Sequence, residues 1–379
     1  MKRALLISTI SGFVPQFEMN SVHILQEHGY EVHYATNYNY VFYGKDNSRL
    51  DGTGIVRHQI DFARSPFSKH TYIAYKQLNK LLSNISFDVI HCHTPIGGVL
   101  ARLLGKKYGV PKIIYTAHGF HFYKGAPIVN WLFYYPVEKY MARYTDALIT
   151  INSEDFIRAQ KFKLQKGGHV YQISGVGIDT RKFRDISVDY EKKRKELGIN
   201  DNDFVMVSVG ELNVNKNHEV VIKGLSKIKH EQIKYFICGE GEYHDDLQAL
   251  IEKLGLVENV FLLGYRTDIV NIEKIADLFV FPSKREGLPV ALMEAMASGL
   301  PVLASKIRGN IDLLESQKNG WLISSDNEKQ WGEYIFRLSN QRTSLKKMGR
   351  SNIEKIKKYD VVEVKKQIES IYREQGVIK

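Results

Sequence analysis

The stretch PSKREGLPVALMEAMASGLPVLA, residues 282–304, decides the fold because it contains a complete passage from a strand into a helix. An apolar run ends at Phe281, and after a short loop Pro289 stands where the first residue of a helix belongs. The residues that follow favour a helix, Gly299 ends it, and Pro301 prevents its continuation. The free N–H groups at the start of such a helix form a ready site for an anion.

Short β-branched runs alternate with amphipathic helical patterns along the whole chain, in two series. We expect strands at residues 4–9, 31–35, 56–60, 89–92, 112–116 and 147–151, and again at 205–209, 234–238, 260–263, 278–281 and 301–304. Apolar strands alternating with helices predict parallel sheets that are covered on both faces. The expected fold class is therefore α/β, with two doubly wound Rossmann-like domains that face a cleft.

The length of the chain also favours two domains. A single core stops growing at roughly 250–300 residues, and this chain has 379. We place an N-terminal domain at residues 1–180 and a C-terminal domain at 181–354, with residues 174–202 as the linker. A charged helical pattern at about 355–379 is expected to pack back on the first domain.

The composition excludes several classes of protein. With 44% hydrophobic and 25% charged residues, the chain is neither disordered nor fibrous. Cys92 and Cys238 have no partner at metal-ligand or redox spacing, which indicates a reducing compartment. We find no signal-peptide pattern and no apolar stretch of the roughly 18 residues that a membrane span needs. A cytoplasmic protein, at most peripheral on a membrane, is expected.

The net charge of +11 lies almost entirely in the first half of the chain. Residues 1–185 hold 23 basic and 13 acidic residues, whereas residues 186–379 hold 30 and 29. A basic half is typical of proteins that bind nucleic acid, an anionic membrane surface or a phosphorylated substrate, but it can also be a solvated surface without a partner. No nucleic-acid motif accompanies the charge, so no nucleic-acid partner is expected.

Two glutamates bracket the helix of the opening stretch. Glu286 precedes its first turn, and Glu294 lies inside it among small residues. A buried carboxylate needs donors, and the hydroxyl groups of a sugar and a ribose would supply them. Alternatively, Glu286 is a favourable charge near a helix start and Glu294 is exposed.

The stretch resembles the signature of the family 4 glycosyltransferases, which have the GT-B fold. The family places two glutamates eight positions apart, with P-S before them and A-x-x-x-G-x-P-V around the helix end. Nine positions match: Pro282, Ser283, Glu286, Gly287, Glu294, Ala295, Gly299, Pro301 and Val302. The resemblance implies that Glu286 holds the donor sugar and Glu294 the nucleoside ribose. It also places Gly287, Leu288, Pro289 and Val290 around the donor.

A second segment, VSVGELNVNKN (residues 207–217), is similar to the family loop in which a basic pair neutralises the donor diphosphate. Lys216 matches the family lysine, but Glu211 stands at the arginine position and cannot pair with a phosphate. Arg285 and Arg308 are candidate replacements, or plain surface arginines. The segment Gly264–Arg266 follows a strand where relatives receive the nucleotide base, so Arg266 is a donor-binding candidate.

The first half of the chain supplies a histidine. In YTAHGFHFYKG (residues 115–125), His118 falls just past an expected strand and matches the family histidine that meets the donor sugar near its reacting carbon. A purely structural His118 is the alternative, and the role of His121 is less certain. Gly12 matches the position of a glycine-rich donor loop. Three stretches together look most like transferases of bacterial capsule and exopolysaccharide synthesis: HTPIGGVLAR (residues 93–102), TAHGFHF (116–122) and GAPIVNWLFYYPVEKY (125–140).

Metal-binding patterns are weak. His91 and His93 share a strand face, but no third ligand stands at useful spacing. Asp201–Asp203 imitates a metal-binding D-x-D but lies in a polar linker, where a solvated turn is expected. We therefore expect no metal and no cofactor.

An aromatic run at residues 131–135, flanked by Lys124, Lys139 and Arg143, suits a membrane–water boundary. It would equally suit a helix buried beneath the first sheet.

The resemblance implies a retaining glycosyltransferase that moves a hexose or N-acetylhexosamine from a nucleotide-sugar, expected to be a UDP-sugar, to a lipid-diphosphate-linked saccharide. His118 and Glu286 are the expected catalytic residues. Contact with an anionic membrane surface is a further expectation. A nucleotide-sugar epimerase and a transferase for a soluble acceptor are the alternatives.

Overall fold

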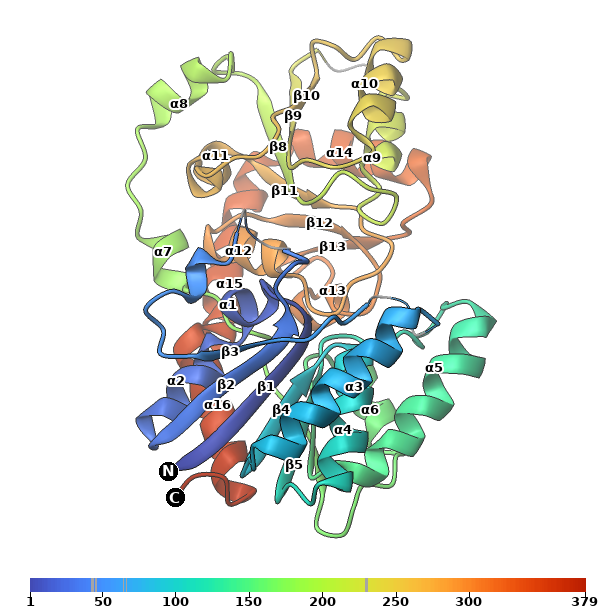
Figure 1. Ribbon diagram of the computed structural model, residues 1–379. Coiled ribbons are helices and arrows are strands. Elements are labelled where there is room, and N and C mark those ends of the chain that lie inside the picture. The colour runs from blue at the N-terminus through green and yellow to red at the C-terminus, as the bar shows by residue number, and fades with distance from the viewer. Residues whose placement is uncertain (42–43, 45, 64, 66, 229–230) are drawn as a thin grey trace. The chain divides into compact units, whose positions relative to one another are not determined.

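The computed structural model describes residues 1–41, 44, 46–63, 65, 67–228 and 231–379, which form two compact units (Figure 1). Unit 1 consists of Met1–Gly177 together with Val361–Lys379, and unit 2 is Ile178–Asp360. The chain therefore leaves unit 1, builds the whole of unit 2, and returns to finish unit 1.

Unit 1 contains a parallel sheet in the order β3-β2-β1-β4-β5-β6-β7. Its strands are β1 (Lys2–Ile10), β2 (Tyr30–Asn37), β3 (Val56–Gln59), β4 (Val89–His93), β5 (Lys112–Ala117), β6 (Ala147–Thr150) and β7 (His169–Gln172). The central strands are buried along most of their length, because helices cover both faces. The strand order reverses between β1 and β4, and ligands of such sheets bind beyond the carboxyl ends at this point.

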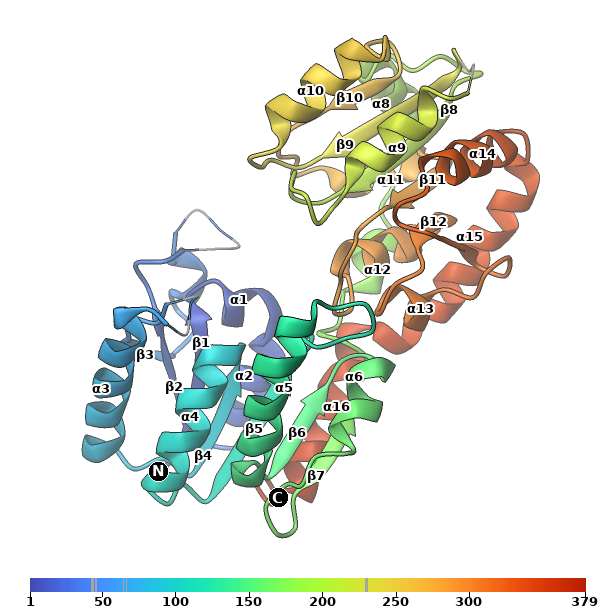
Figure 2. The same cartoon turned by 90° about the vertical axis from the view of Figure 1, so that its right-hand side faces the viewer.

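The helices of unit 1 are α1 (Phe13–Phe17), α2 (Met19–Glu27), α3 (Lys69–Asn84), α4 (Pro95–Lys107), α5 (Ile128–Met141), α6 (Ser153–Ala159) and α16 (Val361–Glu374). Short 3-10 turns occupy Ser48–Leu50 and Ala142–Tyr144. Helices α3, α4 and α5 lie side by side in Figure 2, and α16 packs against α2. Within unit 1, the Tyr372 hydroxyl on α16 lies 2.7 Å from His91 Nδ1 on β4, and Tyr30 Oη donates to the carbonyl of Val377.

Unit 2 contains a parallel sheet in the order β10-β9-β8-β11-β12-β13, with the reversal between β8 and β11. Its strands are β8 (Phe204–Val209), β9 (Ile233–Cys238), β10 (Val260–Leu262), β11 (Leu278–Phe281), β12 (Val302–Ser305) and β13 (Gly320–Ile323). Trp331, which is fully buried, packs with the apolar side chains of these strands.

The helices of unit 2 are α7 (Thr180–Arg184), α8 (Tyr190–Glu196), α9 (His218–Leu225), α10 (His244–Lys253), α11 (Ile269–Ile275), α12 (Val290–Ala297), α13 (Asn310–Leu313), α14 (Glu328–Ser339) and α15 (Arg342–Ile356). A 3-10 turn follows at Lys357–Tyr359. Helix α9 packs against α10 and α14, and α12 packs against α7 and α15. No helix in the described part of the chain combines the length and the apolar character needed to cross a bilayer.

The predicted α/β class with two parallel sheets is confirmed. Strands β7 and β13 were not predicted; β7 is a half-exposed edge strand, and β13 begins at a glycine, so both have weak strand signals. The linker prediction at residues 174–202 is wrong, because α7 and α8 lie inside it and the junction falls after Gly177. The helical pattern at the end of the chain belongs to two helices, separated by the turn at Lys357–Tyr359.

Candidate active site

Two loops at the carboxyl ends of β8 and β11 are held together by one backbone hydrogen bond and two that asparagine side chains donate. The Lys284 N–H donates to the carbonyl of Asn215 at 2.8 Å, and Asn215 Nδ2 donates to the carbonyl of Arg285 at 3.0 Å. Asn217 has a φ of 57°, a left-handed conformation that asparagine tolerates, and its Nδ2 donates to the carbonyl of Pro282. Asn215 and Asn217 were not singled out from the sequence, because polar residues in a polar loop carry no signal.

These bonds bring Lys216 and Glu286 together. Lys216 Nζ lies 2.8 Å from Glu286 Oε1, and the side chains are only 20% and 14% exposed. Gly210 leaves room for the lysine, since a Cβ there would lie 3.1 Å from Lys216 Cε. The residues expected at the donor diphosphate and the donor sugar therefore form one ion pair.

Arg308 supports the backbone of this cluster. It is 6% exposed, and its Nε donates to the carbonyl of Glu286 at 3.0 Å. The adjacent Gly309 is required by close packing, because a Cβ there would lie 2.5 Å from the carbonyl oxygen of Gly287. Arg308 thus has a structural contact in addition to its candidate role toward phosphate, whereas Arg285 is exposed.

Helix α12 begins at Val290, and Pro289 is its N-cap rather than its first helical residue. The reason is the backbone of Pro289, whose ψ of 120° is extended. Leu288 and Pro289 are buried, while Gly287 and Val290 are half-buried. The first N–H groups of the helix have no partner within it and leave a partial positive charge beside Glu286.

Glu294 is half-buried within α12, and burial raises its pKa to about 7, with Lys182 of α7 opposing the shift. The reading of Glu294 as exposed is therefore wrong. Nearby, Glu273 on α11 is 1% exposed and accepts a hydrogen bond from Ser298 Oγ. Burial raises the pKa of Glu273 to about 8, and the charge of Glu294 adds to the rise. Glu273 was missed, since its helical pattern resembles that of any surface acid.

Two other candidates of unit 2 have acidic or polar neighbours. Arg266 is held by Asp268, with contacts of 2.8 and 2.7 Å, and by Glu196 at 3.1 Å. Glu211 is exposed and accepts a hydrogen bond from Asn213 Nδ2. Its carboxylate therefore supplies no positive charge to the predicted diphosphate loop.

In unit 1, His118 follows β5 and lies against a buried carboxylate. Glu18, which is 4% exposed, has its Oε1 at 3.3 Å from His118 Nε2 and 3.5 Å from His93 Nδ1, while Ser21 Oγ donates to its Oε2 at 2.8 Å. Burial alone would raise the pKa of Glu18, but the charge of His93 and the hydrogen bond from His118 outweigh it and hold the pKa well below its usual range.

The same three side chains, Glu18, His93 and His118, are of types that can ligate a metal, and their nearest atoms lie within 4.8 Å of one another. The sequence analysis found no third ligand near His91 and His93, because Glu18 and His118 are distant from them in the chain. His91 packs against His93 but is not part of this cluster, since its nitrogens contact Tyr372 and Thr116. Gly12 caps the short helix α1, and His121 stacks on Tyr134.

Two family models match the chain. The model described as "Glycosyl transferases group 1" matches residues 189–355, and the one described as "Glycosyl transferase 4-like" matches residues 4–152. The first range contains Lys216, Glu286 and Glu294, and the second contains His118.

The similarity to named relatives covers most of the chain. EpsD of Bacillus subtilis (strain 168), named as a glycosyltransferase, is 36% identical over 92% of this chain and 90% of its own. A protein of Escherichia coli named UDP-Gal:alpha-D-GlcNAc-diphosphoundecaprenol alpha-1,3-galactosyltransferase is 32% identical over 70% of each chain.

Solved structures share the fold. HepE (Alr3699) of Anabaena, solved with UDP-glucose, has a TM-score of 0.78 and 19% identity over 98% of this chain and 100% of that one. WaaG, a glycosyltransferase involved in lipopolysaccharide biosynthesis, has a TM-score of 0.75 and 16% identity over 97% and 99%. The predicted GT-B architecture is confirmed.

Proposed function

Because this chain belongs to family 4 of the glycosyltransferases, we propose that it moves a hexose or N-acetylhexosamine from a UDP-sugar to a lipid-diphosphate-linked saccharide, with retention at the anomeric carbon. The product would enter surface polysaccharide. The Escherichia coli relative supports this choice, since its name specifies a UDP-Gal donor and a diphosphoundecaprenol acceptor.

The observation that carries the proposal is the Lys216–Glu286 ion pair, whose glutamate lies only four residues before the start of α12. A half-buried ammonium group and free helix N–H groups suit a diphosphate, and the carboxylate suits sugar hydroxyls. We assign the diphosphate to Lys216 and the donor sugar to Glu286. When the diphosphate arrives, Lys216 can divide its hydrogen bonds between the phosphate and Glu286.

In the proposed reaction, the bond between the anomeric carbon and the diphosphate oxygen breaks, and its electron pair leaves with UDP. The acceptor hydroxyl oxygen bonds to the same carbon, and its proton passes to the departing phosphate. Lys216 and the start of α12 stabilise the charge that develops on UDP. We assign the contact near the reacting carbon to His118, and the ribose to Glu294.

The remaining donor contacts are assigned by position. Gly12, Gly287, Leu288, Pro289 and Val290 would meet the donor through their backbones. Arg266 would lie near the base. Since Lys216 and the helix N–H groups can offset the diphosphate charge, we propose that the enzyme needs neither a cofactor nor an obligatory metal.

The proposed acceptor implies where in the cell the enzyme acts. A lipid-linked saccharide stays in the membrane, so we propose a cytoplasmic enzyme that binds the inner face of the cell membrane peripherally. Exposed apolar side chains on α5, namely Ile128, Val129 and Leu132, support contact with lipid.

A donor screen tests the proposal. Uridine, guanosine and thymidine diphosphate sugars are compared by thermal shift, and the hit is then assayed for transfer. UDP-sugars should raise the melting temperature most. Glu294→Ala should weaken UDP binding, whereas His118→Ala should leave binding largely intact and lower turnover. Wild-type turnover in both variants contradicts the assignments, and conversion of the donor without an acceptor identifies an epimerase.

A further inference from the structure

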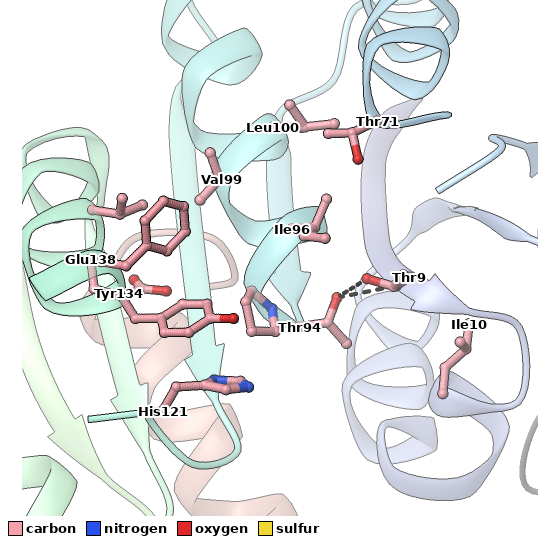
Figure 3. Close-up of a pocket in the computed structure, with 13 residues that line it drawn as sticks. Thr9, Ile10, Thr71, Thr94, Ile96, Val99, Leu100, His121, Tyr134 and Glu138 are labelled. Carbon is pink, nitrogen blue, oxygen red and sulfur yellow. Dashed lines mark hydrogen bonds between the residues drawn. The ribbon is translucent and has the colours of Figure 1, made fainter. Parts of the chain in front are cut away.

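A cavity of about 480 Å³ lies in unit 1 over α4, between α3 and α5 (Figure 3). Figure 3 shows Ile96, Val99 and Leu100 of α4 on one side and Tyr134 of α5 on the other. Phe133 and Val137 of α5 add to the apolar lining. We call this cavity the α4 groove. Its surface is mainly apolar, which is unlike a site built for a sugar alone.

One end of the α4 groove is polar and lies at the carboxyl ends of the central strands β1 and β4. There the hydroxyls of Thr9, near the end of β1, and Thr94, directly after β4, are 2.7 Å apart. Figure 3 marks this hydrogen bond with a dashed line. This is the point where the strand order of unit 1 reverses, and where ligands of such sheets bind. The groove therefore begins where the reacting end of an acceptor is expected.

The other end of the groove borders exposed apolar side chains. Phe67, which is 82% exposed, has its ring centroid 5.2 Å from that of Phe133 in the groove wall. Val129 lies one helical turn before Phe133 and is 65% exposed, and Leu132 is 74% exposed. Large apolar side chains gathered in this way mark an interaction surface.

The exposed charges on the two helices that flank the groove are of one sign. Apart from the buried Glu138, every charged side chain on α3 and α5 is a lysine: Lys69, Lys76, Lys80 and Lys139, all exposed. Glu138 is already paired with Arg102 at 2.8 Å. An apolar track flanked by lysines complements a molecule that carries both a hydrocarbon chain and phosphates.

We propose that the α4 groove binds the hydrocarbon chain of the lipid-diphosphate acceptor, which passes from the exposed rim at Phe67 and Leu132 toward Thr9 and Thr94. This inference rests on the proposed function, since it takes the acceptor class from it. Each methylene group buried in such a groove increases affinity about fourfold, so the length of the chain should govern binding.

The test measures binding of defined probes to the full-length protein by calorimetry, without a donor. Inorganic diphosphate, geranyl diphosphate and farnesyl diphosphate are compared. Affinity should rise with chain length, by about tenfold or more from inorganic diphosphate to farnesyl diphosphate. Equal affinities for the three probes in the wild-type protein overturn the inference, and this result needs no variant.

A variant locates the site. Val99→Phe fills the groove with an apolar side chain and should weaken farnesyl diphosphate binding about tenfold or more. The matched control is Val257→Phe, at a position in unit 2 that is 50% exposed, which should bind as the wild type does. Unchanged binding by Val99→Phe overturns the inference.

Transfer assays separate this inference from the proposed function. If no UDP-sugar is transferred to any acceptor while binding still follows chain length and is lost in Val99→Phe, the proposed function fails and the groove assignment stands. If transfer occurs equally well to short-chain and long-chain acceptors, the groove assignment fails and the proposed function stands.

Discussion

Glu294 is the residue whose ionisation should be visible in binding. Its pKa, raised by burial to about 7, means that the carboxylate is lost as the pH falls below neutrality. If UDP binds only the carboxylate, its affinity should fall about tenfold from pH 8 to pH 6. Glu294→Gln should bind UDP more weakly and lose this part of the pH dependence. Calorimetry on both proteins measures the difference.

The control for that experiment is Glu258→Gln, which changes an exposed acid of the same unit. It should retain the wild-type pH dependence. If Glu294→Gln follows the same pH profile as the wild type, the assignment of the ribose to Glu294 is wrong.

Glu18 should act through His118. Its Oε1 lies 3.3 Å from His118 Nε2, so Glu18→Gln removes the charge that orients the ring while keeping its shape. We expect kcat to fall about ten- to a hundredfold, because small misplacements of a reacting group have large effects, with KM for the UDP-sugar little changed. Steady-state kinetics separates the two constants.

Glu27→Gln is the matched control, since Glu27 is an exposed acid on α2 that pairs with Lys365. It should leave kcat unchanged. A parallel rise in KM for Glu18→Gln, with kcat intact, would show that Glu18 serves binding rather than the placement of His118.

Candidate site residues could be singled out from the sequence where a local motif contains them. Glu286, Glu294 and Lys216 stand in short segments with family-specific spacing, and the structure joins two of them at 2.8 Å. Glu18 and Glu273 were not predictable, because their partners come from other elements. A lone acid in a helical pattern has the same appearance whether it is buried or solvated.

At the scale of elements, Glu273 of α11 contacts Ser298, the C-cap of α12, and burial favours its protonated form by raising its pKa to about 8. Glu273 loses its proton near pH 4.5 when unfolded and near pH 8 in the fold. The folded protein thus binds the extra proton between these values, and the free energy of unfolding falls by about 1.4 kcal/mol per pH unit from this group. Its stabilising effect is complete below about pH 4.5 and lost by about pH 8.

Glu273→Gln should remove this dependence, because a neutral amide still accepts from Ser298 Oγ. We expect the variant to match the wild type near pH 5 and to exceed its stability at pH 9. Urea unfolding at three pH values measures this, with Glu333→Gln on α14 as an exposed control. An equal difference at pH 5 and pH 9 contradicts the protonated state.

The contact of α16 with β4 can be tested by Tyr372→Phe. The change leaves His91 Nδ1 buried without the hydroxyl that lies 2.7 Å away, at a cost of about 1–3 kcal/mol in the free energy of unfolding. Tyr140→Phe, on the exposed side of α5, should cost much less. Denaturant unfolding compares the two variants, and equal losses would contradict the role of the buried bond.

Element prediction succeeded where apolar runs are long and buried. Strands β1, β4, β5 and β8 are buried along most of their length and each contains an apolar or β-branched run, so their existence followed from the pattern alone. Strand β7 was not predicted, because about half of it is exposed and its apolar pattern is weak. The helices α7 and α8 were not predicted, because short charged segments between two sheets have the composition of a linker.

At the scale of the whole molecule, unit 2 is one continuous segment, whereas unit 1 needs both ends of the chain. We expect residues 178–360 expressed alone to fold and to bind UDP within about threefold of the full chain, since Lys216, Glu286 and Glu294 all lie in them. Residues 1–177 alone should not fold stably, because they lack α16. Circular dichroism and calorimetry on the two fragments check this, and a stable fragment 1–177 would contradict it.

The two junctions of unit 2 meet within unit 2 itself, where Ile178 and Asp360 form a β-bridge. A segment whose two ends are adjacent in space can be replaced as one unit. The replacement does not change the distance that the flanking parts of the chain must span. Under the proposed function, recombination at these two junctions would exchange the residues assigned to the donor in one genetic step and leave unit 1 unchanged. Chimaeras joined at Gly177 and Val361 are accordingly the natural way to reprogram this enzyme.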